Sequence, residues 1–173
     1  MILDDVARGD GVAVLDPHGD LIERLLDLLP DSAVERTIHF HPGHPQWIPI
    51  WNPLQSVPGQ DLGRTADDLV KALKSVVKDW GDRLEHLLRQ AIYALLHVPG
   101  TTLLDVYYVL RGKSPRSNAL RRRILESVDN EVAREFWTED FNDYRKTDLA
   151  PPRHKLSKLR SLIMASKLPS PLG

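Results

Sequence analysis

The chain has 173 residues, of which 42% are hydrophobic and 27% are charged, with 23 Lys/Arg against 24 Asp/Glu. This composition is typical of a globular protein and excludes a disordered one. The absence of cysteine excludes disulfides and thiolate chemistry. No apolar run is long enough to cross a bilayer, and no basic region followed by an apolar run opens the chain, so neither a membrane helix nor a signal peptide is expected.

The N-terminal third has the pattern of a strand, a helix and a second strand. After a short helix that ends at Gly9, the apolar run 11–16 predicts a strand buried on both faces. Leucines at one-face spacing predict a helix over 21–29, and 34–40 predicts the second strand. The short connections favour a parallel pair. We therefore expect an α/β unit over 1–56, and expect it to be incomplete alone, because two strands leave edges unpaired.

The rest of the chain has helical periodicity. Residues 41–60 hold five prolines and predict an ordered loop that leads into this part. We expect an all-helical lobe over 57–168, a tail over 169–173 and a fold that is mainly α by content. The expected helices are 66–80, 83–97, 102–110, 118–128, 131–144 and 151–166.

A group of polar residues follows the first predicted strand. It comprises Asp16, His18, Gly19 and Asp20. Ligands of open α/β sheets bind at the carboxyl ends of strands, so these residues could form the edge of a nucleotide site, near a magnesium ion or an attacking water. The alternative is a tight turn in which Asp20 caps the following helix.

Three histidines lie close together at the end of the second predicted strand. His39 and His41 would point to the same side of a strand, and His44 follows them. Such spacing can bind zinc or nickel, although a fourth ligand is not obvious, and the alternative is a set of surface histidines in a loop. A histidine-dependent metallohydrolase would rest on His18, His39, His41, Asp16 and Asp20.

Charge is distributed unevenly along the chain. Residues 1–110 carry 9 Lys/Arg and 16 Asp/Glu (9 − 16 = −7), and residues 111–173 carry 14 and 8 (14 − 8 = +6). The stretch 111–123 holds six Lys/Arg and no acid, and a stretch of this kind can bind nucleic-acid phosphates or form a solvated surface. Arg121, Arg122 and Arg123 spread around a helix and therefore do not form one stripe. Arg116, at the start of that helix, and Arg123 are the better candidates for phosphate contact. The DNA-binding candidates are Lys113, Arg116, Arg121, Arg122 and Arg123.

The four tryptophans offer two alternatives. Stacking on exposed bases is one use of Trp47, Trp51, Trp80 and Trp137. Burial is the preferred interpretation, because Trp80 and Trp137 lie on amphipathic helices beside core residues.

An ordered series of motifs resembles a known family. These motifs are Gly11-Val-Ala-Val-Leu-Asp-Pro-His-Gly-Asp-Leu21, Trp51-Asn-Pro-Leu54, Asp79-Trp-Gly-Asp-Arg-Leu-Glu85, Glu135-Phe-Trp137 and His154-Lys-Leu156. In this order they resemble HerA/FtsK-type P-loop ATPases, and among these the type IV secretion coupling proteins of conjugation (TraG/TraD-like). The resemblance implies a partial RecA-like P-loop sheet followed by the family's all-α insert domain. It also implies that the insert contacts DNA or a relaxosome or secretion substrate, in the cytoplasm or at the inner membrane face, and that complete members form homo-oligomeric rings.

The chain departs from this family at its catalytic centre. It has no G-x-x-x-x-G-K-[ST] phosphate-binding loop (Walker A) and no strand that ends in an acidic magnesium-binding pair (Walker B). ATP and magnesium are therefore expected only in a complete homologue, and no catalytic or metal residue is assigned to this chain. We interpret it as a fragment of a DNA-translocating ATPase, from a truncated gene, a mis-called start or an excised piece. The alternative is a non-catalytic helical DNA- or protein-binding module.

Overall fold

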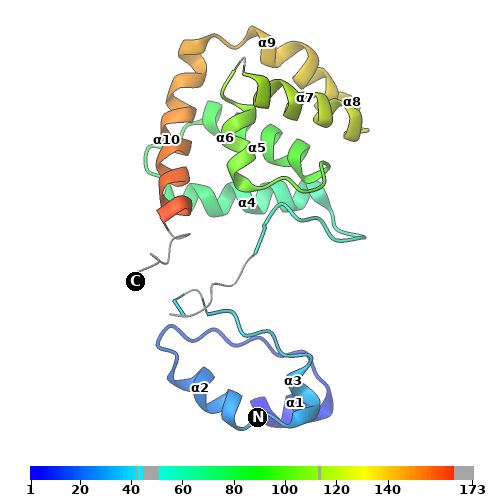
Figure 1. Cartoon of the computed structure of the whole chain (residues 1–173), viewed down its shortest axis with the longest axis vertical. Coiled ribbons are helices and arrows are strands. Elements are labelled where there is room, and N and C mark those ends of the chain that lie inside the picture. The colour runs from blue at the N-terminus through cyan, green and yellow to red at the C-terminus, as the bar shows by residue number, and fades with distance from the viewer. Residues whose placement is uncertain (42, 45–50, 113, 166–173) are drawn as a thin grey trace, which may run out of the picture. The chain divides into compact units, whose positions relative to one another are not determined.

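The computed structural model describes residues 1–41, 43–44, 51–112 and 114–165, and the chain divides into two compact units, Met1–Ile50 and Trp51–Gly173 (Figure 1). The segment that opens the second unit belongs with the helices that follow it. Leu54 is buried in their core, and Asn52 Nδ2 donates to the Thr101 carbonyl at 2.6 Å. The tail expected over 169–173 lies outside the described residues.

The N-terminal unit is formed by three short helices and two stretches without regular structure. The helices are α1 (Ile2–Arg8), α2 (Asp20–Asp27) and α3 (Asp31–Val34). Neither predicted strand forms. Residues 10–16 and 37–41 have no regular secondary structure and no ladder of backbone hydrogen bonds (Figure 1). The described residues contain no strand at all, so the expected α/β fragment with a partial P-loop sheet is wrong. A strand exists only when a neighbour accepts its hydrogen bonds, and here the two apolar runs do not pair with each other.

All regular secondary structure in the described part of the second unit is helical, and the expectation of a mainly helical chain is confirmed. Its helices begin where the sequence supplies caps. Asp61 accepts the Arg64 amide at 3.0 Å, Ser114 accepts the Ser117 amide at 3.2 Å, and Asn130 accepts the Ala133 amide at 3.0 Å. In order along the chain they are α4 (Leu62–Val76), α5 (Asp82–Leu96), α6 (Leu103–Val109), α7 (Pro115–Ser127), α8 (Glu131–Glu135), the π-helix η1 (Phe136–Asp140), α9 (Phe141–Asp143) and α10 (Lys146–Ala165).

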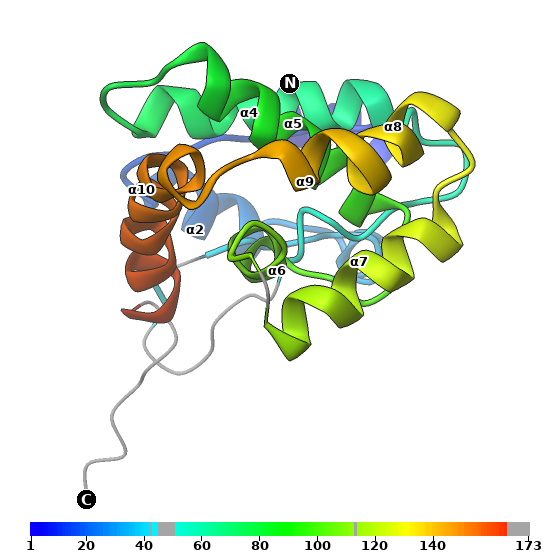
Figure 2. The same ribbon diagram turned by 90° about the horizontal axis from the view of Figure 1, so that it is seen from above.

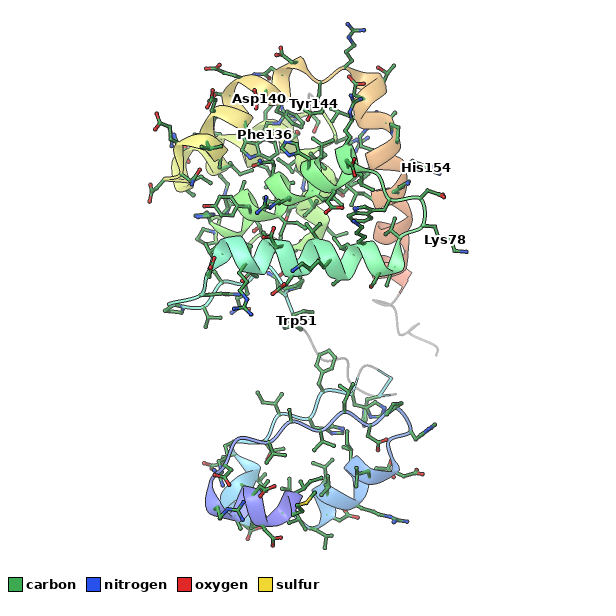
Figure 3. All side chains as sticks on the ribbon, turned by 180° about the vertical axis from the view of Figure 1, so that it is seen from behind. Trp51, Lys78, Phe136, Asp140, Tyr144 and His154 are labelled. Carbon is green, nitrogen blue, oxygen red and sulfur yellow. The ribbon has the colours of Figure 1, made fainter. Side chains whose placement is uncertain are left out.

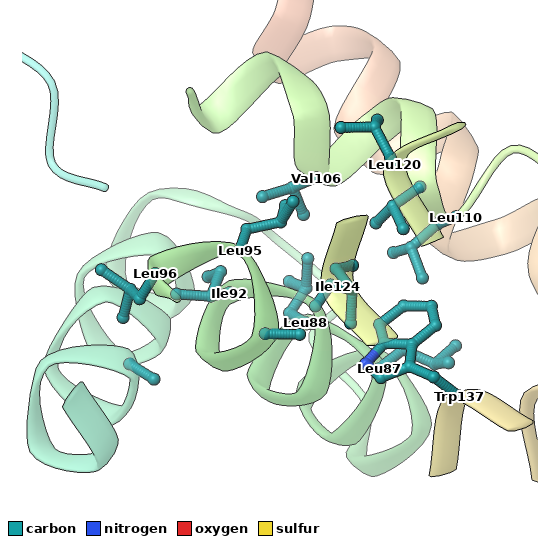
Figure 4. Packing of buried hydrophobic residues seen from close by; sticks show 14 of the residues in the cluster. Leu87, Leu88, Ile92, Leu95, Leu96, Val106, Leu110, Leu120, Ile124 and Trp137 are labelled. Atoms are coloured by element: carbon teal, nitrogen blue, oxygen red, sulfur yellow. The ribbon is translucent and has the colours of Figure 1, made fainter. Parts of the chain in front are cut away.

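Helix α5 forms the centre of the core. Its residues Leu87, Leu88, Ile92 and Leu95 are no more than 2% exposed, and they pack against Val106 of α6 and Ile124 of α7 (Figure 4). Helix α4 covers another side of α5. Each of these side chains contributes about 1.5–3 kcal/mol through its removal from water, which makes α5 the main source of stability in this unit.

The π-helix η1 interrupts the run from α8 to α9 and brings aromatic rings into the core. The extra residue in its turn rotates the following side chains relative to an α-helix. Phe136, Trp137 and Phe141 are all at most 3% exposed, and the Trp137 ring centre lies 5.0 Å from that of Phe141. Phe136 faces the interior while Asp140 lies at the surface (Figure 3). The preferred expectation that Trp137 is buried is confirmed.

Candidate nucleic-acid interface

The turn between α6 and α7 carries the start of the basic stretch. Helix α6 ends at Val109, and Gly112 has φ 92°, a left-handed conformation that favours glycine. Ser114 then caps α7, whose first residue is Pro115. Helix α6 lies between α7 and α10 (Figure 2), so side chains from both neighbours can reach this turn.

Arg121 of α7 holds the turn from one side. Its Nη2 donates to the Gly112 carbonyl at 2.9 Å, to the Ser117 hydroxyl at 2.9 Å and more distantly to the Val109 carbonyl at 3.4 Å. Val109 ends α6, where the helix dipole is negative and attracts a cation. The Arg121 side chain is therefore positioned by the fold and is not a freely extended surface cation.

Arg153 of α10 reaches the same turn from the other side. Its Nη1 donates to the Arg111 carbonyl at 3.4 Å, and its Nε donates to the Leu149 carbonyl at 3.1 Å within α10. Arg121 and Arg153 thus bond to the carbonyls of two adjacent residues, and Arg111 itself is exposed on the turn. Sequence reasoning missed Arg153, because 42 residues separate it from Arg111 and no local pattern connects α10 with this turn. We call Arg111, Arg121 and Arg153 the basic turn.

The basic turn has no acidic partner among the residues that the structure describes. In the part of the chain that the structure describes, none of its three guanidinium groups forms an ion pair. Burial lowers the pKa of Arg121, because the charged guanidinium is partly removed from water, and its buried Nε has no hydrogen-bond partner among the described residues. An anion placed at the turn would offset this cost of desolvation.

Arg116 lies beside the basic turn but is already paired. Its Nη2 is 2.9 Å from Asp105 Oδ1, and its guanidinium carbon is 3.6 Å from the centre of the Tyr108 ring. Asp105 is buried and also accepts the Thr102 amide at 2.9 Å, in a capping box that begins α6. The main role of Arg116 is therefore to join α7 to α6, although more than half of its side chain surface is accessible.

The remaining DNA-binding candidates are dispersed. Arg123 Nη2 donates to the Pro99 carbonyl at 2.5 Å, which directs it toward the loop before α6. Arg122 is exposed and has no partner among the described residues. Lys113 lies outside the described residues. Of the four predicted cations that the structure describes, Arg121 alone lies with Arg111 and Arg153 at the basic turn.

The predicted nucleotide-site edge has a different role in the structure. Asp16 accepts the backbone amides of His18 at 3.0 Å, Leu21 at 2.9 Å and Ile22 at 3.3 Å, so Asp16 rather than Asp20 closes the start of α2. Partial desolvation acts to raise the pKa of Asp16, but the amide hydrogen bonds outweigh it and leave the pKa below its ordinary value. Gly19 has φ 90° and allows the chain to turn, while His18 and Asp20 are exposed.

The histidines form a loose cluster of rings. The ring centres of His39 and His41 are 5.7 Å apart, and those of His41 and His44 are 5.6 Å apart. Over the described residues, no three His, Asp or Glu side chains converge to hold a metal ion. The metallohydrolase hypothesis stays a prediction.

The tryptophans show both kinds of environment. Trp80 is half-buried and its Nε1 donates to Glu85 Oε2 at 2.7 Å, whereas Trp51 is 70% exposed. Trp47 lies outside the described residues.

Within the described helices, none combines the length and the apolar character needed to cross a bilayer. Comparisons with protein-family models, with curated proteins and with solved structures found no match to this chain.

Proposed function

We propose that the helical unit is a non-catalytic module that binds nucleic-acid phosphates through the basic turn. The observation that supports this is the convergence of Arg121 and Arg153 on adjacent carbonyls, with Arg111 exposed beside them and no carboxylate paired with them among the described residues. Arginine provides several fixed N–H donors that suit phosphate oxygens, and phosphate contacts position a protein on nucleic acid without reading its sequence.

The family resemblance extends this proposal to a biological setting. In a DNA-translocating assembly of the conjugation and type IV secretion kind, the helical unit would contact the DNA or its protein cargo. The chain itself, without a phosphate-binding loop, would contribute contact and not hydrolysis.

Binding of a fluorescent duplex and of the corresponding single strand, followed by anisotropy across a salt titration, tests the proposal. The double variant Arg111→Gln with Arg153→Gln removes two cations of the basic turn. If both contact phosphate, the slope of log K against log salt should become shallower by about 1.8 for the duplex, since each contact contributes about 0.9.

A matched control removes two cations from α4 of the same unit. Arg64 and Lys71 are exposed, and Arg64→Gln with Lys71→Gln changes the net charge by the same amount. The control variant should retain the salt slope of the unmodified chain. Equal losses in both double variants would show that net charge alone governs binding, and an unmodified chain that binds neither probe at low salt would exclude the proposal.

A further inference from the structure

The N-terminal unit leaves its apolar residues unburied. In its described residues, 1–41 and 43–44, only Ala33 is buried, at 1% exposure, whereas Leu15 and Ile38 are 96% and 92% exposed. Large exposed apolar surfaces of this kind are characteristic of interaction sites, because covering them removes apolar area from water and lowers the free energy.

These residues surround an open hollow of about 630 Å³. The helices supply one part of its wall, through apolar side chains such as Leu3 and Val6 of α1 and Ile22 and Leu25 of α2. Another part of the wall is formed by residues 11–15 and 36–40, which belong to the runs 11–16 and 34–40 predicted as strands. Both segments are drawn without helix or strand in Figure 1.

The backbone of these two runs has unused hydrogen-bonding groups. The amides of Val12, Ala13, Val14, Leu15 and Ile38 donate to no group in the described part of the chain, and the two runs are not bonded to each other. A buried amide without an acceptor is costly, so an occupant that covers the hollow must also supply carbonyl groups. A stretched peptide segment presents donors and acceptors along both of its edges, which a helix or a small apolar molecule does not.

The net charge of the N-terminal unit indicates which kind of peptide segment would bind in the hollow. Residues 1–50 contain 3 Arg and 9 Asp/Glu, a balance of 3 − 9 = −6. Two copies of this unit would repel each other at close range, whereas a segment with basic residues beside its apolar part would be attracted.

We propose that the hollow of the N-terminal unit binds an extended apolar segment of a different polypeptide, flanked by Lys or Arg, which lies along residues 11–15 and 36–40 and pairs with their backbone. Such recognition depends on the main chain and tolerates variation in apolar sequence. It concerns a different site from the basic turn and does not depend on nucleic-acid binding.

The test uses the full chain and the synthetic peptide Lys-Lys-Val-Thr-Val-Thr-Val-Lys-Lys. Amide hydrogen exchange measured by NMR reports directly on Val12 to Leu15 and on Ile38. On saturation with peptide, exchange at several of these amides should slow by about tenfold or more, while amides in the core of α5 should be unaffected. A peptide with N-methyl groups on its valines has lost the backbone donors of one edge and should bind at least about tenfold more weakly.

Two further experiments test the charge and the apolar contact that the proposal requires. A peptide with Glu in place of its lysines should bind more weakly at low salt, and equal binding would overturn the charge argument. The variant Val14→Gln, which removes an apolar side chain from the wall of the hollow without changing the charge, should bind the basic peptide more weakly but retain nucleic-acid binding by the basic turn. If no peptide changes the exchange rates of these amides, the proposal is overturned. It is also overturned if, without peptide, exchange at these amides slows as the protein concentration rises, because the occupant would then be a second copy of the chain.

Discussion

The guanidinium carbon of Arg121 on α7 lies 4.6 Å from the centre of the Phe141 ring on α9. Through this contact and its bonds to the α6–α7 turn, one arginine connects three segments of the helical unit. Its neighbour Arg122 is exposed and forms none of these contacts. Two adjacent arginines of the same basic run therefore differ in role, one at the junction of helices and one on the surface.

Replacement of Arg121 by Met should destabilise the helical unit, whereas Arg122→Met should not. The first change leaves the carbonyl of Gly112 without its charged donor, and hydrogen bonds to charged groups contribute about 1.5–3 kcal/mol. The second change should alter the free energy of unfolding by less than about 0.5 kcal/mol. Urea denaturation followed by circular dichroism measures both, and equal midpoints for the two variants would contradict the structural role of Arg121.

Truncation in the core of α5 should have a larger effect. Leu87 is fully buried, and Leu87→Ala should lower the free energy of unfolding by about 2–5 kcal/mol, through lost burial and the cavity that remains. Val132→Ala is the control, because Val132 is 70% exposed and should cost less than about 0.5 kcal/mol. Thermal and urea denaturation of the two variants would show whether α5 is the centre of the fold, and a similar loss in both would argue against it.

The connection between α4 and α5 should weaken in acid. Glu85 Oε2 accepts from Lys74 Nζ at 2.8 Å and from Trp80 Nε1 at 2.7 Å, and these two hydrogen bonds, that from Lys74 first, hold the pKa of Glu85 below its ordinary 4.5. A carboxyl group with a lowered folded pKa stabilises the fold above its unfolded pKa, and this contribution is lost as the pH falls through the folded value.

The variant Glu85→Gln isolates this contribution. Its melting temperature should lie below that of the unmodified chain at neutral pH, by an amount that is constant down to about pH 4.5 and shrinks in more acidic solution. Glu126→Gln is a suitable control, because Glu126 is exposed and forms no ion pair within the described residues. A difference between Glu85→Gln and the unmodified chain that does not change with pH would refute the role of the charged carboxylate.

The basic turn could be predicted from the sequence only in part. The run 111–123 identified Arg121 as a candidate, because consecutive cations without an acid are visible locally. The interactions that commit Arg116 to Asp105 and Arg123 to the Pro99 carbonyl depend on how α6 and α7 pack, which no local pattern encodes. The contribution of Arg153 arises because α10 packs against α6.

The sequence by itself determined the helical character of the second unit. The spacing of apolar residues acts within a few residues, so it can be read without knowledge of the fold. The runs 11–16 and 34–40 have the composition of strands, but strand formation requires hydrogen-bond partners outside the run itself. Only the tertiary structure decided that these partners are missing in the described residues, and that the apolar side chains instead border an open hollow.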